Sequence, residues 1–126
     1  MASLAGPGSA DPLVAELRRS GLVSLLVLHF VAHDACYGNQ LMDQILALTG
    51  GSVTVNPNTM YPLLRSLEAR GLVEGDWEHP ERRSRRFYRI TAAGEQERRI
   101  LARRLDPNLA AIQSTIELIR QELREY

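Results

Sequence analysis

The sequence is poor in several features, and each shortage excludes a class of protein. A single cysteine, Cys36, rules out an internal disulfide framework and a multi-cysteine metal cage, which fits a reducing cytoplasm. The longest apolar run, residues 22–32, is broken by Ser24 and His29, so no segment reaches membrane-spanning length. Residues 1–10 lack the basic start and long apolar run of a secretion signal, and we expect a disordered tail there. The sequence predicts a cytoplasmic protein without a membrane segment.

Lysine is absent, so all 15 basic residues are arginines, and they balance 15 acidic residues. Nine of the arginines lie between positions 82 and 104, where the only acidic residues are Glu95 and Glu97. Each guanidinium can hold a phosphate or a guanine edge through two donors. We therefore expect a local basic face on a protein with no net charge. The plainer alternative is a solvated arginine-rich surface.

Residues with catalytic or metal-binding chemistry do not form a recognisable site. No nucleophile is paired with a base by spacing, and no glycine-rich phosphate loop follows a strand. His29, His33 and Cys36 could share a helix face, but no further histidine or cysteine nearby completes a four-ligand site. We expect no enzyme, no metal and no cofactor, and we interpret Cys36 as a small buried side chain rather than a redox switch.

Residues 56–71 predict a helix with clear ends. Pro57 excludes the helical conformation from Asn56 and suits a first turn, so the helix should begin between residues 56 and 59. Asn58 and Thr59 are residue types whose side chains can accept from the free amides at that end. Gly71 should stop the helix with a left-handed cap.

The two faces of this helix differ in chemistry. Met60, Leu64 and Leu67 recur at spacings of four and three, so they should face the core. The other side carries hydrogen-bonding groups, an aromatic ring and a guanidinium. Such side chains suit groove edges and phosphates, and we take as candidate DNA contacts Asn58, Thr59, Tyr61 and Arg65.

Two strands, residues 72–78 and 85–91, should follow this helix. The linker, residues 79–84, contains Pro80 and is too long for a two-residue turn, so it should project as a wing. Tyr88 and Ile90 share one strand face and should close the core, and Trp77 should cover the apolar face of the sheet. The arginines of this hairpin are candidate DNA contacts: Arg82, Arg83, Arg85, Arg86 and Arg89.

The segments before and after this unit complete a winged-helix order. One helix should run from Asp11 to about His33, and a second should follow Gly38, with Leu41, Ile45 and Leu48 as its apolar repeat. The sequence therefore predicts a mainly α protein with a small β-hairpin wing. We divide it into a winged helix-turn-helix DNA-binding domain, residues 11–91, and a C-terminal helical dimerisation region, residues 92–126.

The C-terminal region carries an apolar seam with alternating spacings of three and four. A helix over residues 107–125 is about 28 Å long, too long for so small a domain to cover its stripe. A partner chain is the natural cover, and packing on the first helix of the same chain is the alternative. Asp106 and Pro107 should kink or break the helix. The predicted dimerisation residues are Leu109, Ile112, Ile116, Ile119 and Leu123.

The chain resembles the PadR family of bacterial transcriptional regulators over about residues 17–94. The resemblance rests on Tyr37-Gly38, Thr59-Met60-Tyr61-Pro62, Leu67-Glu68, Gly71-Leu72, the run RRFYRIT at 85–91 and Ala93-Gly94. It adds Pro62 to the candidate DNA contacts. It also implies the short branch of the family, whose members are typically homodimeric repressors that dimerise through the C-terminal helix. Asn58 departs from the glycine that many members carry before the Thr-x-Tyr-Pro element.

Together, the residues and the resemblance predict a sequence-specific DNA-binding transcriptional regulator. We expect a homodimeric repressor that is released by a small-molecule effector. Two reading helices about one duplex turn apart, roughly 34 Å, would require an inverted-repeat operator in double-stranded DNA. The alternative is a winged helix that recognises a protein and does not bind DNA.

Overall fold

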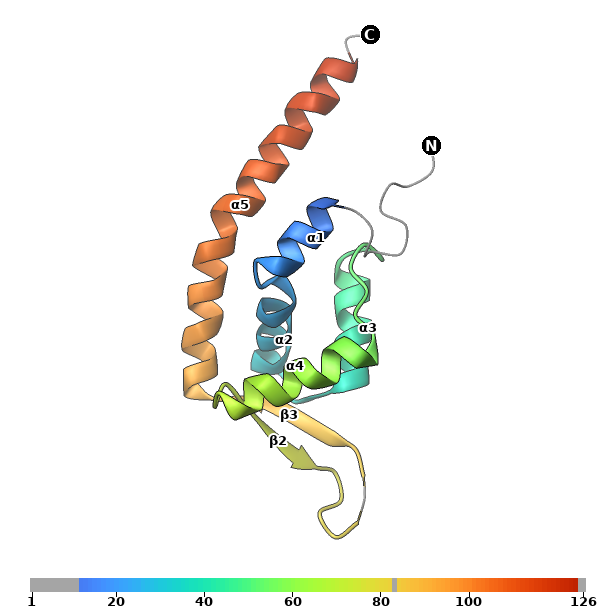
Figure 1. Ribbon diagram of the computed structural model, residues 1–126, viewed down its shortest axis with the longest axis vertical. Helices are drawn as coiled ribbons and strands as arrows, with labels where there is room; N and C mark the ends of the chain where they lie inside the picture. The colour runs from blue at the N-terminus through green and yellow to red at the C-terminus, as the bar shows by residue number, and fades with distance from the viewer. Residues whose placement is uncertain (1–11, 83, 125–126) are drawn as a thin grey trace.

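The computed structural model describes residues 12–82 and 84–124. The predicted tail, residues 1–10, and Arg83 lie outside the described residues. In Figure 1, α2 stands between α3 and α5, while α4 crosses near their lower ends above a hairpin. The elements in chain order are α1 (Pro12–Arg19), α2 (Leu22–His33), β1 (Cys36–Tyr37), α3 (Gly38–Leu48), α4 (Pro57–Ala69), β2 (Val73–Trp77), β3 (Arg86–Ile90) and α5 (Ala92–Arg124).

The first predicted helix is two helices, so that expectation was wrong. Gly21 separates α1 from α2 and has a φ of 99°, a left-handed conformation that an α-helix cannot contain. The break lets α1 tilt away from α2 (Figure 1). The apolar residues of α2 then occupy the middle of the fold, where Val27 and Leu28 are fully buried.

The sheet has three antiparallel strands in the order β1-β3-β2, one more than the sequence predicted. The missed strand is only two residues long: Cys36 pairs with Tyr88, and Tyr37 pairs with Phe87. The predicted hairpin is confirmed with shorter strands, and its register runs from Val73 opposite Ile90 to Trp77 opposite Arg86. Its tip projects beyond the helices (Figure 1).

The core joins α2, α3, α4, the sheet and the first half of α5. The inward face predicted for α4 is confirmed, because Met60, Leu64 and Leu67 are 0, 0 and 1% exposed. On α3, Leu41 and Ile45 are buried, but Leu48 is 60% exposed because it lies at the last residue of the helix. The structure therefore corrects the third member of that apolar repeat.

A kink or a break was predicted at Pro107, and the break does not occur, because α5 is continuous from Ala92 to Arg124. The helix bends part of the way along (Figure 1), and a proline inside a helix is a common cause of such a bend. Its first half packs on α2 and buries Leu101 and Leu105. Its second half extends beyond the rest of the described fold. No helix in the described ranges is long and apolar enough to cross a membrane.

Candidate nucleic-acid interface

Helix α4 presents the residues predicted to contact DNA to solvent. Asn58, Thr59, Tyr61, Pro62 and Arg65 are all exposed, on the side opposite the buried apolar face. No ion pair holds the Arg65 guanidinium among the residues that the structure describes. Tyr61 lies against the start of α3, where a Cβ at Gly38 would be 2.6 Å from the tyrosine Cε1 atom. The glycine of the Tyr37-Gly38 pair therefore lets α3 and α4 approach closely.

The sequence suggested Asn58 and Thr59 as the side chains that cap the start of α4. The structure shows that Asn56 caps it instead. The Asn56 Oδ1 atom accepts from the Thr59 backbone N–H at 3.0 Å, and Pro57 occupies the first turn. At the other end, Gly71 has a φ of 73°, which confirms the left-handed cap. The Leu72 N–H donates to the Leu67 carbonyl at 2.9 Å, so the chain leaves the helix directly into β2.

This capping separates the roles of two neighbouring asparagines. Asn56→Ala should lower the free energy of unfolding by about 1 kcal/mol, because an N-terminal amide loses its acceptor. Asn58→Ala, on the exposed reading face, should change it by less than about 0.5 kcal/mol. Urea denaturation of both variants measures the difference, and equal losses of stability would contradict the assignment of the cap.

The hairpin arginines are mostly paired with acidic residues. Arg85 Nε lies 3.3 Å from Glu78 Oε2, and Arg86 Nη2 lies 2.6 Å from Glu68 Oε2. Arg89 is engaged by Asp76 and, at 3.6 Å, by Glu74. Arg82 is exposed and has no ion pair among the described residues, and Arg83 lies outside them.

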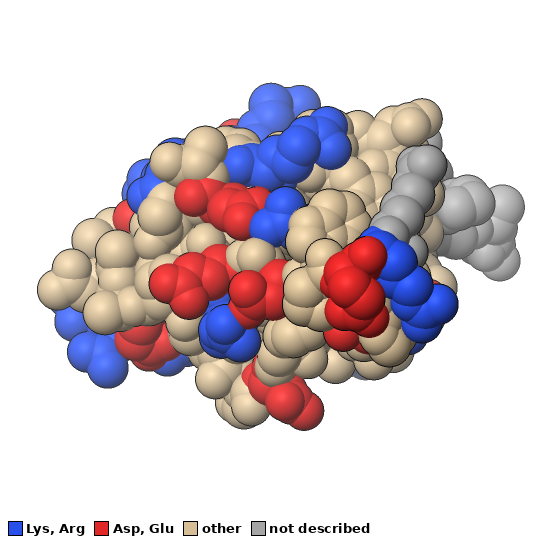
Figure 2. All heavy atoms as spheres, turned by 90° about the horizontal axis from the view of Figure 1, so that it is seen from below, with Lys and Arg blue, Asp and Glu red and all other residues tan. Residues whose placement is uncertain are grey.

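This pairing corrects the expected basic face. Further along, Arg98 and Arg99 share Glu95 as a partner. Viewed from the hairpin end, basic and acidic side chains alternate over the surface (Figure 2). The run of arginines was visible in the sequence, but the acidic partner of Arg86 comes from α4 and those of Arg89 come from the facing strand. The local positive charge is therefore smaller than the sequence suggested.

Two of the ion pairs, Arg85 with Glu78 and Arg98 with Glu95, also shift the pKa values of their groups. The hydrogen bond from Arg85 lowers the pKa of Glu78, and the same contact raises the pKa of Arg85. Likewise, the hydrogen bond from Arg98 lowers the pKa of Glu95. Glu78 and Glu95 therefore carry their charge throughout the neutral range, so both members of each pair are charged there.

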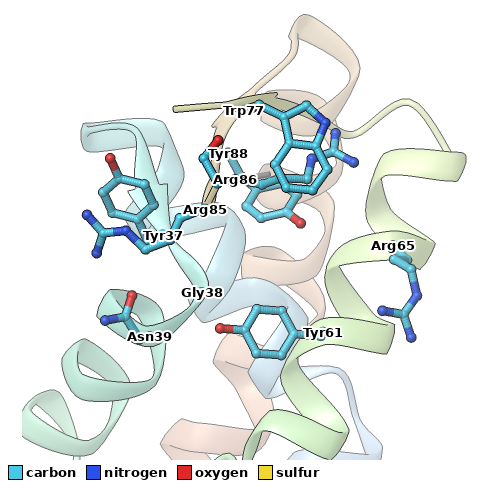
Figure 3. Close-up of a pocket in the computed structure, with 10 residues that line it drawn as sticks. Tyr37, Gly38, Asn39, Tyr61, Arg65, Trp77, Arg85, Arg86 and Tyr88 are labelled. Carbon is cyan, nitrogen blue, oxygen red and sulfur yellow. The ribbon is translucent and has the colours of Figure 1, made fainter. Parts of the chain in front are cut away.

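A cleft of about 440 Å³ separates α4 from the hairpin. Figure 3 shows Tyr61 on one side and Trp77 on the other, with Tyr88 behind them. Trp77 is 47% exposed, so the expectation that it covers the apolar face of the sheet was wrong. Tyr88 is buried as predicted, and burial raises its pKa. Sequence reasoning also missed Tyr37, which lines this cleft because β1 pairs with β3.

The residues once considered as metal ligands form no such group. No cluster of three or more His, Cys, Asp or Glu side chains suited to a metal occurs within residues 12–82 and 84–124. Cys36 is buried, as predicted, at 3% exposure. Burial, followed by the charge of Asp34, raises the pKa of its thiol, which keeps the reactive thiolate scarce.

A helix with an exposed polar face, packed on a mainly helical core and followed by a projecting hairpin, defines a winged-helix DNA-binding protein. The chain belongs to the transcriptional regulator PadR-like family, whose family model matches residues 27–100. The transcriptional regulator Rv3488 of Mycobacterium tuberculosis is 37% identical over 79 residues, which are 63% of this chain and 70% of that protein.

Solved structures give the same result. A PadR family transcriptional regulator from Eggerthella lenta is 32% identical, with a TM-score of 0.65 over 83% of this chain and 89% of that one. A putative transcriptional regulator from Thermoplasma acidophilum matches with a TM-score of 0.67 over 80% of this chain and 94% of that one; at 21% identity it supports the fold alone. The resemblance noted in the sequence is confirmed: the chain is a DNA-binding transcriptional regulator, and its relatives are not enzymes.

Proposed function

We propose that the protein is a homodimeric repressor that reads an inverted repeat in double-stranded DNA. The observation that carries the proposal is the exposed polar face of α4, which is anchored by three buried residues on its other side. In this proposal α4 enters the major groove of each half-site. The proposed dimer acts in the cytoplasm, and a small-molecule effector releases the dimer from its operator.

The arginines proposed to contact DNA differ in whether they are already paired with an acidic residue. Arg65 on α4 and Arg82 at the wing have no ion pair among the described residues, so each can neutralise a phosphate directly. Arg85 and Arg89 would first exchange an acidic partner for a phosphate. In this proposal the shorter polar side chains and the tyrosine of α4 contact the base edges: Asn58, Thr59 and Tyr61, with Pro62 beside them.

The dimer is proposed from the second half of α5. Its seam residues are uncovered in the single chain, with Leu109 at 38%, Ile116 at 42% and Leu123 at 68% exposure. Packing of the seam on the chain's own first helix therefore receives no support from the structure. Ala111, Ile112, Thr115, Ile116 and Ile119 line a shallow apolar hollow on this helix that a second copy could fill. Two chains joined along α5 would present two α4 helices to one duplex.

Salt dependence of DNA binding tests the proposal. If a dimer contacts about six phosphates, log affinity against log salt should fall with a slope near −5. Arg82→Gln should reduce the steepness by about 2, because a dimer loses two contacts of about 0.9 each. Arg103→Gln, which removes an exposed arginine in the first half of α5, is the matched control and should leave the slope unchanged.

The measurement uses fluorescence anisotropy of a labelled duplex taken from the region upstream of the protein's own gene, after footprinting has located the site. A slope near zero on that duplex would overturn the proposal. It would favour the alternative, a winged helix that recognises a protein. That alternative also expects substitution of Arg82, Arg83, Arg85 and Arg86 to leave DNA affinity unchanged.

A further inference from the structure

Arg86 is placed unlike the other described arginines of the hairpin. Its Nη2 atom donates to Glu68 Oε2 on α4 at 2.6 Å and to the Gly75 carbonyl on β2 at 2.8 Å. The Gly75 N–H in turn donates to the same Glu68 oxygen at 3.3 Å. One arginine of β3 therefore ties the reading helix to both strands of the hairpin.

The space around this contact is shaped to hold it. A Cβ at Gly75 would lie 2.5 Å from Arg86 Nη2, so only glycine leaves room for the guanidinium there. The Arg86 guanidinium carbon lies 5.3 Å from the ring centre of Trp77 and 5.7 Å from that of Tyr88, within the range of cation–π attraction. Figure 3 shows the Arg86 side chain beside both rings.

The neighbouring arginines make no comparable connection. Arg85 pairs with Glu78 at the end of the hairpin, and Arg89 pairs with Asp76 and Glu74 on the adjacent strand. Their side chains are 59% and 49% exposed, against 30% for Arg86. Among the described hairpin arginines, Arg86 is the one that pairs with an acid of α4.

We propose that Arg86 and Glu68 are positioning residues, which fix the angle between the wing and the reading helix, and that Arg86 does not contact DNA. The proposal rests on the proposed function, in which α4 and the wing engage one duplex together. Both can reach their contacts only if their relative orientation suits the duplex, and an orientation fixed in the free protein lowers the entropic cost of binding. This positioning role replaces the sequence-based assignment of Arg86 as a DNA contact.

Substitution of each partner separates positioning from direct contact. Arg86→Gln and Glu68→Gln should each weaken binding to the footprinted upstream duplex about tenfold, as expected for loss of a charge-assisted bond. Neither should change the salt slope, because no phosphate contact is lost. The double variant should bind no more weakly than either single variant, since both break the same contact.

Glu68→Gln gives the sharpest contrast. It removes a negative charge near DNA, so without a positioning role it should leave affinity unchanged or increase it. Either result, or a reduction of the slope in Arg86→Gln equal to that in Arg82→Gln, would overturn the proposal. A slope near zero for the wild-type protein would instead overturn the proposed function, so the two failures are distinguishable.

A second measurement needs no DNA. Trp77 is the chain's one tryptophan and lies beside Arg86, so its fluorescence reports on this contact. Acrylamide should quench Trp77 more strongly in Glu68→Gln than in wild type, while Arg82→Gln should match wild type. Equal quenching in all three proteins would refute the positioning role. Arg86→Lys and Glu68→Asp provide milder variants if the first pair unfolds.

Discussion

Replacing Ile116 with glutamate should convert the protein into a monomer and weaken its binding to the footprinted duplex by about a hundredfold or more. Ile116 lies in the middle of the exposed seam of α5. In a two-fold dimer the substitution would bring two carboxylates into one apolar interface, where an unpaired charge is costly. Each chain should still fold, because the position is solvent-exposed in the single chain. Loss of avidity then accounts for the loss of affinity.

Sedimentation equilibrium measures the mass, and anisotropy measures the affinity. Ser114→Glu is the matched control, since it adds the same charge to the same exposed helix outside the seam. This control should remain dimeric and should bind like wild type. A dimeric Ile116→Glu protein would refute the seam as the interface, and a monomeric one that keeps full affinity would refute the need for two chains.

Replacing Gly94 with alanine should have the largest effect on stability, lowering the free energy of unfolding by about 3 kcal/mol. The added Cβ would lie 2.0 Å from the backbone carbonyl oxygen of Leu72 and 2.7 Å from Ile90 Cγ1. Backbone cannot yield as a flexible side chain can, so α5 would have to move away from β2. The loss comes from this collision and not from a strained φ, because Gly94 is not among the glycines with positive φ.

Gly71→Ala is the informative comparison. Nothing lies within 4 Å of a Cβ at that position, but its φ of 73° is unfavourable for alanine. We therefore expect a smaller loss, about 1–2 kcal/mol, from backbone strain alone. Urea denaturation of the two variants should rank Gly94→Ala as the less stable. The reverse order would mean that the start of α5 can shift away from β2 at little cost.

Local patterns predicted the elements that bury one face. The spacing of Met60, Leu64 and Leu67 identified the inner face of α4, and Pro57 and Gly71 marked its ends, because these signals act within a few residues. The winged-helix order followed from those elements. A strand of two residues, such as β1, offers no alternation to detect, and it became visible only through its pairing with β3.

Other features depended on partners distant in the chain. A lone Gly21, between Ser20 and Leu22, does not reveal whether it will take a positive φ. The run of arginines predicted a basic surface. The sequence alone does not show that Arg86 lies within hydrogen-bond distance of Glu68, which is 18 positions earlier. For the candidate site, the sequence could nominate the residues of α4, but the ion pairs within the hairpin required the structure.

The path of α5 has a consequence for control of DNA binding. The helix begins two residues after β3 ends, and the Thr91 hydroxyl between them donates to the Gly71 carbonyl at the end of α4. From there it runs without interruption for about 50 Å to Arg124. Helix α5 therefore connects the end of α4 directly to the proposed dimer seam. A rotation of a few degrees between two chains at the seam would move each wing by several ångströms, so a molecule bound at the seam could change DNA affinity without touching α4.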